Sequence, residues 1–337
     1  MKKILHYLYF VALVFLFFAC RNERLSIDVS GIEADLDIVR LEQKLFEKDS
    51  VRFRNNMNEL MASHYDFFET YTAYVLNIGP PDHPEFASHL HAFITDTVIA
   101  RVADSVLYLF SDFSPWEKML EEGFRHYAWY FPGKTLPQIY TCISGFNESI
   151  FTSGNSAAIG LDKYMGSDCI FYRYLGIPRY KTQKMYPRKM VSDLFFSLFI
   201  TLFPYQEPVD HLLANMIYLG KALYFTEAMC PDLPDTLLTG FTGQQSEWCA
   251  ANEEAMWTYL AEQRLLYDTE RLTVQRYTGD APFTSTFSDQ SPGRTGVWLG
   301  WQIVRSFMNQ HPEVSLQAMI EAYDAQTLLA QSGYNPD

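Results

Sequence analysis

Residues 189–229 read KMVSDLFFSLFITLFPYQEPVDHLLANMIYLGKALYFTEAM, and this stretch decides the fold. Apolar side chains cover nearly the whole circumference of 190–203, which predicts a helix buried on all sides. Pro204 terminates this helix, and a second helix is predicted over 209–229, before Pro231. A helix that is apolar all round needs packing partners on both sides. We therefore place this pair at the centre of the domain.

Helical periodicity extends over most of the remaining chain. Before the central pair, apolar residues recur three and four positions apart in 38–46, 53–76, 86–110 and 115–131. After the pair, the same spacing predicts helices over 246–266, 297–310 and 315–332. Near the start, the alternation of Leu25, Ile27 and Val29 predicts a short strand instead.

Residues 132–178 have a different character, rich in Ile, Tyr and Thr. The segment SIFTSGNSAAIGLD (149–162) places Ser-Gly-Asn-Ser between two strand-like runs, which is typical of a hairpin. We expect a small antiparallel sheet of about three strands between two helical blocks. The predicted class is therefore α+β and predominantly helical. No change in composition divides residues 37–337, so we expect a single domain there.

Composition and charge narrow the function classes. The chain has 337 residues, of which 48% are hydrophobic and 16% aromatic, and this excludes a disordered protein. Its formal net charge is −14. An acidic chain argues against nucleic acid and against anionic lipid headgroups as main partners.

The N-terminus is typical of a lipoprotein signal peptide. Lys2 and Lys3 precede an apolar run that ends at Ala19, and Cys20 follows directly. The run is shorter than the about 20 residues that a membrane-spanning helix needs. We predict a signal peptide over 1–19, a lipid anchor on Cys20 and a tether over 20–36. An ordinary signal peptide or an uncleaved anchor with an incidental cysteine is the alternative.

Loss of the signal peptide would make the chain more acidic, with a net charge of −16. Acyl chains on Cys20 would hold it at a membrane by hydrophobic transfer alone. Four further cysteines remain: Cys142, Cys169, Cys230 and Cys249. An oxidising envelope compartment would permit any of three pairings, and four unpaired buried thiols are the alternative. Their spacing speaks against structural zinc.

The two central helices resemble the arrangement of zinc peptidases, but the chemistry is missing. Such enzymes carry His-Glu-x-x-His on a central helix, so that two His ligands and a Glu base share one face. Here Ser192 and Phe196 stand at the ligand positions and Asp193 at the position of the base. His211 and Glu227 would complete a set only by accident. We therefore predict no catalytic metal and no cofactor. Asp193 then has one of two structural roles: its negative charge interacts favourably with the dipole at the helix N-terminus, or it pairs with Arg188.

The most unusual segment is SPGRTGVWLGWQIVRSFM, residues 291–308. Gly296 and Gly300 lie one turn apart and allow another backbone to approach closely. Trp301 and Arg305 lie four apart, so the indole and the guanidinium can stack. Two interpretations remain open: a helix packed tightly into the core, or the wall of a cleft. For the second, the candidate cleft or partner-binding residues are Asp193, Arg294, Trp298, Trp301 and Arg305.

Several motifs together resemble the gliding-motility lipoprotein GldB family. They are GLDKYMG (160–166), GIPRY (176–180), NMIYLGKALYF (215–225), WCAANEEAMW (248–257) and SPGRTGVWLGWQIV (291–304). The resemblance implies a lipid-anchored protein of the cell envelope, on its periplasmic or outer-membrane face, with Cys20 as the lipidated residue. It also implies other envelope proteins of the motility and secretion apparatus as partners. No catalytic residues are assigned to the family, so the resemblance implies a non-enzymatic protein.

A more distant resemblance concerns a family of predicted zinc peptidases. Residues 219–225 are similar to their Glu-Gly-Leu-Ala-x-Tyr-Phe helix, with Leu219 in place of Glu, and 297–304 is similar to a later motif. This resemblance implies a metallopeptidase-like scaffold without metal ligands. It also gives an alternative function, a degenerate peptidase-like protein that binds peptide or glycan in the former active-site cleft. Fold alone does not establish such a function.

Overall fold

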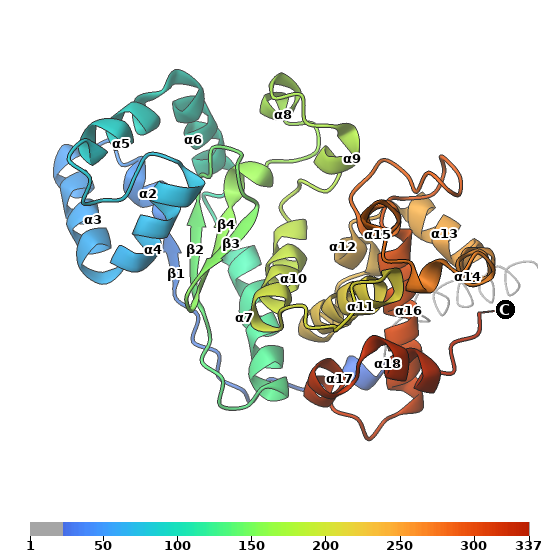
Figure 1. Ribbon diagram of the computed structural model, residues 1–337. Coiled ribbons are helices and arrows are strands. Elements are labelled where there is room, and N and C mark those ends of the chain that lie inside the picture. Colours follow the sequence, from blue (N-terminus) through green and yellow to red (C-terminus); the bar gives the residue numbers. More distant parts are fainter. Residues whose placement is uncertain (1–22, 337) are drawn as a thin grey trace, which may run out of the picture.

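The computed structural model describes residues 23–336, in which helices surround one small sheet (Figure 1). The helices before the sheet's hairpin are η1 (Glu23–Leu25), α2 (Leu41–Leu45), α3 (Ser50–Ser63), α4 (Tyr65–Thr70), η2 (Tyr71–Val75), α5 (Phe86–Thr95), α6 (Thr97–Leu109) and α7 (Ser114–Tyr130). Those after it are η3 (Leu161–Lys163), α8 (Ile170–Tyr174), α9 (Arg179–Thr182), α10 (Lys189–Leu202), α11 (Leu212–Met229), α12 (Asp235–Thr239), α13 (Gly243–Ala251), α14 (Glu253–Glu262), η4 (Leu265–Tyr267), α15 (Arg271–Thr278), α16 (Thr295–Gln310), α17 (Leu316–Ala322) and α18 (Ala325–Gln331). The predicted class, α+β and predominantly helical, is confirmed.

The sheet has four strands in the order β1-β2-β4-β3. They are β1 (Ile38–Arg40), β2 (Gln138–Cys142), β3 (Ile150–Ser153) and β4 (Ser156–Gly160). The predicted hairpin is confirmed, because β3 and β4 pair antiparallel across the turn. The prediction of an antiparallel three-stranded sheet is wrong, because β1, β2 and β4 run parallel to one another.

Two features of the chain explain this error. β1 has only three residues and lies in 38–46, which the helical spacing of its apolar side chains assigned to a helix. Its partner β2 follows about a hundred residues later, after the helices α2–α7. Parallel strands need such long connections, and neither their pairing nor their direction is visible in local periodicity.

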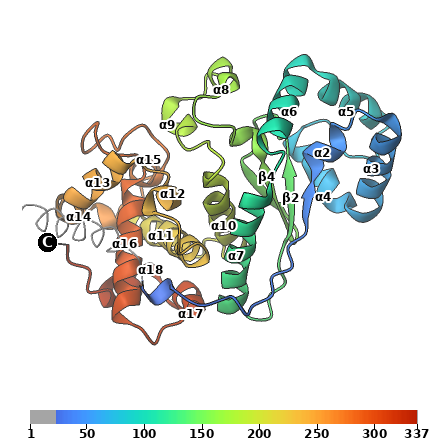
Figure 2. The same ribbon diagram turned by 180° about the vertical axis from the view of Figure 1, so that it is seen from behind.

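The two faces of the sheet bury different side chains. Along β2, Ile139 packs into the larger hydrophobic core, whereas Tyr140 and Cys142 pack into the smaller one. The larger core includes residues of α7, α10, α11 and α16, and the smaller one residues of α2–α5. The ring of Phe67 stacks on Tyr140, with centroids 3.6 Å apart. Successive strand residues point to opposite faces, so helices cover the sheet on both sides (Figures 1 and 2).

The central helix pair is confirmed, and a third helix completes it. Almost every side chain of α11 is buried, because α10 lies on one side of it and α16 on another. A Cβ atom added at Gly300 would lie 1.9 Å from the carbonyl oxygen of Met216. A Cβ at Gly220 would lie 2.4 Å from the carbonyl carbon of Gly300. The backbones of α11 and α16 therefore touch at a contact that only glycine permits, as predicted for Gly300.

The segment before β1 lies against the body of the molecule. The strand predicted from Leu25, Ile27 and Val29 is not formed, because η1 occupies residues 23–25 and coil follows it. Leu25 and Val29 are nevertheless buried. The Arg24 guanidinium donates hydrogen bonds to the carbonyl oxygens of Met308, His311 and Val314. The alternation of Leu25, Ile27 and Val29 therefore reflects the burial of Leu25 and Val29 and not a β-strand.

The described residues add two findings about anchoring and cross-linking. Between residues 23 and 336, the structure has no helix that is both long and apolar enough to cross a bilayer. Cys142, Cys169, Cys230 and Cys249 are all free thiols, three of them buried and Cys169 half-buried. Of the two alternatives for these cysteines, the structure has the unpaired one.

The contact between α11 and α16 leads to a first prediction. Gly300→Ala should lower the free energy of unfolding by at least about 2 kcal/mol, because the new methyl group meets backbone atoms that cannot move aside. The matched control is Gly243→Ala at the first residue of α13, where an added Cβ has nothing within 4 Å. Its effect should lie between zero and about 1 kcal/mol of stabilisation. Urea unfolding of the two variants measures both, and equal effects would contradict the close contact.

Candidate functional site

The candidate residues fall into two clusters at opposite ends of α12. We call the first the Glu227 clamp; its members are Glu227, Asp235, Trp301 and Arg305. We call the second the Asp193 cluster; its members are Tyr164, Lys189, Ser192 and Asp193. Two candidates belong to neither cluster: Trp298, which is 7% exposed and part of the larger core, and Arg294, which directly precedes α16.

The Glu227 clamp ties α11, α12 and α16 together. Nε1 of Trp301 donates to Oε2 of Glu227 at 2.8 Å. Arg305 donates to both carboxylate oxygens of Glu227, at 3.0 and 2.9 Å, and to both of Asp235, at 3.0 Å each. The guanidinium carbon of Arg305 lies 3.5 Å from the centroid of the Trp301 ring. The predicted stacking of Trp301 and Arg305 is thereby confirmed.

Two members of the clamp, Glu227 and Arg305, are largely buried. The side chains of Glu227 and Arg305 are 7% and 20% exposed. Burial alone would lower the pKa of Arg305, but Glu227 and Asp235 raise it above its ordinary value. Trp301 is fully buried, and its indole N–H is satisfied by Glu227. The cationic residue of this apolar helix therefore finds both a carboxylate and an aromatic face inside the protein.

The Asp193 cluster lies at the start of α10. Nζ of Lys189 and Oδ1 of Asp193 are 2.5 Å apart, and the Tyr164 hydroxyl donates to Oδ2 at 2.9 Å. Lys189 also donates to the hydroxyl of Ser192 at 3.0 Å, and Ser192 donates to the carbonyl oxygen of Leu237 at 2.7 Å. The ion-pair partner of Asp193 is thus Lys189, one turn away, and not its neighbour Arg188. Sequence reasoning overlooked this pair, although the spacing of four residues indicates it.

Helix α12 connects the clamp with the Asp193 cluster. Its first residue, Asp235, accepts hydrogen bonds from Arg305. Near its end, the carbonyl oxygens of Leu237 and Leu238 accept from Ser192 and Lys189. The negative charge of Asp235 at the start of α12 and the positive charge of Lys189 near its end both interact favourably with the helix dipole. The two clusters therefore hold one short helix between α10 and α16.

Arg294 lies against α10 at Phe196, three residues after Asp193. It precedes α16 with a left-handed φ of 62°, and its guanidinium carbon lies 5.5 Å from the centroid of the Phe196 ring. Close by, Nζ of Lys184 pairs with Oδ1 of Asp280 at 2.9 Å. Burial and the positive charge of Arg294 lower the pKa of Lys184. Burial alone would raise the pKa of Asp280, but Lys184 and Arg294 together hold it below its ordinary value.

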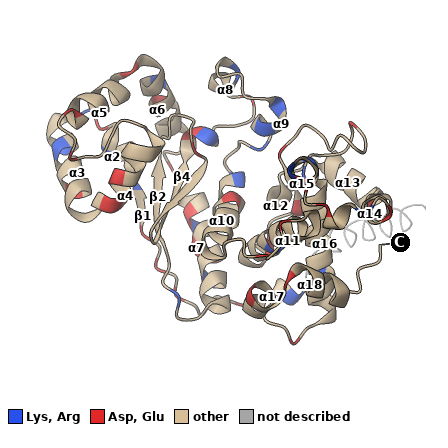
Figure 3. Cartoon of the chain, in the orientation of Figure 1, with Lys and Arg blue, Asp and Glu red and all other residues tan. Residues whose placement is uncertain are grey.

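Sequence reasoning missed the concentration of positive charge in residues 163–189, which we call the basic projection. It contains seven basic residues and a single acidic one, Asp168, in a chain whose net charge is −14. The basic residues are Lys163, Arg173, Arg179, Lys181, Lys184, Arg188 and Lys189. Its helices α8 and α9 stand out from the body (Figures 1 and 3). A count of charges in a sliding window would have revealed it.

The carboxylates named for a peptidase-like site are not brought together with His211. His211 caps α11, where its Nδ1 accepts from the amide of Ala214 at 3.0 Å. Asp193 and Glu227 belong to the two separate clusters. Over residues 23–336, the structure holds no group of three or more His, Cys, Asp or Glu side chains able to bind a metal ion.

The clamp leads to a second prediction. Arg305→Met should lower the free energy of unfolding by about 3–5 kcal/mol, because it leaves the buried carboxylate of Glu227 without its cation. Adding Glu227→Gln should restore part of this loss, since the amide oxygen can still accept from Trp301. Arg52→Met is the control, because the Arg52 side chain is 76% exposed, and it should change stability by less than about 0.5 kcal/mol. A double-mutant cycle measures the coupling, and strictly additive effects would contradict the clamp.

Comparison with known proteins identifies the family. No curated protein and no solved structure matches the chain significantly. A family described as gliding motility protein GldB matches residues 22–336, which include every element described above. The motifs around the central helices and along α16 had indicated the same family. The chain therefore belongs to the GldB gliding-motility lipoprotein family.

Proposed function

We propose that this protein is a lipid-anchored component of the cell envelope that binds protein partners of the motility and secretion apparatus and catalyses no reaction. Its family supports the envelope and the anchor. The observation that supports a non-catalytic role is the pairing of charges around α10 and α11. Each carboxylate that a peptidase could use there is bound by cations or hydroxyls of the chain itself.

The pairing of Asp193 and Glu227 argues against catalysis. A general base needs a free lone pair within reach of a water molecule or a substrate. Asp193 is held by Lys189 and Tyr164, and Glu227 by Arg305 and Trp301. The hydroxyl of Ser192 is fully buried and engaged with Leu237. We therefore infer that Asp193, Glu227 and Ser192 stabilise the packing of the helices and do not take part in a reaction.

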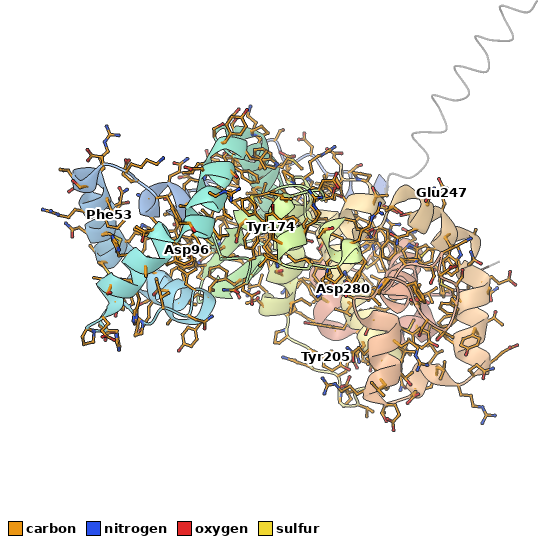
Figure 4. The ribbon with its side chains drawn as sticks, turned by 90° about the horizontal axis from the view of Figure 1, so that it is seen from above. Phe53, Asp96, Tyr174, Tyr205, Glu247 and Asp280 are labelled. Carbon is orange, nitrogen blue, oxygen red and sulfur yellow. The ribbon has the colours of Figure 1, made fainter. Side chains whose placement is uncertain are left out.

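The basic projection is the surface that best fits a protein partner. Phe171 and Tyr172 of α8 point into the body, and the Tyr172 hydroxyl donates to the carbonyl oxygen of Asp162 at 2.9 Å. Tyr174 and Leu175 on the other side are 74% and 54% exposed, next to the exposed Arg173. Figure 4 looks down on this end of the molecule, with Tyr174 near the middle of the view. Tyrosine and arginine on a rigid support are typical of binding hot spots.

Charge indicates the kind of partner. Without residues 163–189, the rest of the chain would carry a net charge of −20, so the projection is a local exception. A basic patch attracts an acidic surface and disfavours a basic one. We therefore expect an acidic protein surface as the partner, contacted through Arg173, Arg179 and Lys181.

This leads to a third prediction. Replacing Arg173, Arg179 and Lys181 together by Glu should abolish gliding of a host that depends on this protein, because the docking surface would then repel an acidic partner. The matched control is the replacement of Lys48, Arg52 and Arg54 by Glu at the start of α3, where the cations are also exposed. Spreading of colonies measures gliding, and immunoblots of membranes confirm equal amounts. Normal gliding of the first variant would contradict this docking surface.

A fourth prediction concerns Cys20, which lies outside the described residues. Cys20→Ser should remove the acyl chains and release the protein from membranes or leave it unprocessed. Labelled fatty acid should enter the wild-type protein and not the variant. Labelling of the variant to the wild-type level would contradict lipidation at this residue.

One observation favours the alternative, a peptidase-like scaffold that binds peptide or glycan. A groove of about 500 Å³ opens beside the C-terminal end of α10, lined among others by Phe199, Phe203, Tyr218 and Lys221. Its volume lies in the range of ligand sites. Titration calorimetry with a peptide library and with glycan fragments would separate the two functions, since only the alternative gives stoichiometric binding that is lost when Tyr218 is removed.

A further inference from the structure

We propose that the groove beside η1 faces the membrane and receives an acyl chain of a bilayer lipid. This groove is separate from the basic projection. This proposal rests on one part of the proposed function, the lipid anchor, and does not depend on the protein partner. Three observations support it: where the described chain begins, what lines the groove, and which polar group remains unpaired in it.

The position of η1 sets the distance to the bilayer. Two residues, Arg21 and Asn22, separate Cys20 from Glu23, the first residue of η1, so the three steps from Cys20 to Glu23 span at most about 10 Å. From Arg24 onward the chain is fixed to the body, because Arg24 binds the carbonyl oxygens at the end of α16 and Leu25 is buried. A lipid on Cys20 would therefore hold the surface around η1 close to the membrane. The basic projection lies at the opposite end of the molecule (Figures 1 and 2).

The surface around η1 is hollow and mainly apolar at its base. The groove has a volume of about 610 Å³ and runs between η1, the end of α7 and the loop before α17. Leu25, Met308, Val314 and Leu316 line it and are buried, so they form its floor. Apolar lining of this volume fits a flexible hydrocarbon chain better than a charged headgroup. Among the described residues that line it, the only cation is Arg24, which already binds three carbonyl oxygens.

Two aromatic residues at the end of α7 fit a membrane interface. Trp129 lines the groove and is 47% exposed, and its ring packs edge-on against Tyr130 with centroids 4.7 Å apart. Indole and phenol rings are enriched where a membrane surface meets water, because one end is apolar and the other polar. An exposed Trp next to the anchoring point therefore favours contact with lipid.

The Tyr130 hydroxyl supplies the polar contact. It is buried and has no hydrogen-bond partner among the described residues. A buried hydroxyl without a partner costs free energy, which a suitable ligand would recover. Tyr130 lines the groove, and we infer that its hydroxyl turns toward a bound phospholipid, whose ester carbonyl accepts this hydrogen bond while the acyl chain covers the apolar floor. One lipid thus satisfies both the shape and the chemistry of the groove.

The test uses the full-length lipidated protein in vesicles of phosphatidylethanolamine and phosphatidylglycerol with brominated acyl chains. Bromine quenches the fluorescence of nearby tryptophan, so wild-type protein should lose intensity relative to vesicles without bromine. Trp129→Phe should reduce this quenching at least twofold. The matched control is Trp116→Phe, thirteen residues earlier on the same helix and about 20 Å away, which should leave the quenching unchanged.

Flotation of the vesicles is measured in parallel and reports the anchor. Protein that floats but shows no quenching by bromine, or the same quenching with Trp129→Phe, would overturn the groove proposal and leave the anchor intact. Those results would also be expected if the protein's own acyl chain or a partner's segment filled the groove. Protein that does not float would overturn the anchor and, with it, this proposal. Neither result depends on the basic projection or its partner.

Discussion

The backbone contact between α11 and α16 is the constraint on which the rest of the structure depends. Gly220 and Gly300 allow the two helices to touch, and any side chain at either position would force them apart. At this distance Trp301 can reach Glu227 with its indole N–H, and Arg305 can reach it with its guanidinium. A wider separation would leave a buried carboxylate without its partners, at a cost of several kcal/mol. Close packing and the charge network therefore require each other.

The same network explains why the carboxylates of the two central helices are engaged inside the protein. Two long buried helices with carboxylates on them are what a peptidase would offer. In this chain both carboxylates bind cations that hold α12. Glu227 binds Arg305, which also binds Asp235 at the start of α12. Asp193 binds Lys189, which reaches the carbonyl oxygen of Leu238 near its end. The proposed non-catalytic role rests on these partners of the carboxylates, not on the fold.

The proposed interactions lie at two ends of the molecule. At one end, Arg24 fixes the start of the described chain beside an apolar groove with Trp129 at its rim. At the other, α8 presents Arg173 and Tyr174 on a support of buried aromatic rings. A short lipid anchor at the first end would present the second away from the membrane. This arrangement suits a protein that holds a partner at a fixed distance and orientation from a bilayer.

The sequence by itself determined the features that depend on neighbouring residues. It predicted the helical class, the central pair, the hairpin between β3 and β4, the close approach at Gly300 and the stacking of Trp301 with Arg305, because each follows from local spacing. Only the tertiary structure decided the parallel pairing of β1 with β2, since a strand of three residues has no periodicity of its own and its partner lies about a hundred residues away. The partners of Arg305 and the burial of Leu25 and Val29 were likewise decided by elements far apart in the chain. Contacts at long sequence separation leave no local pattern, and here they determine which charges are paired inside the protein and which remain exposed.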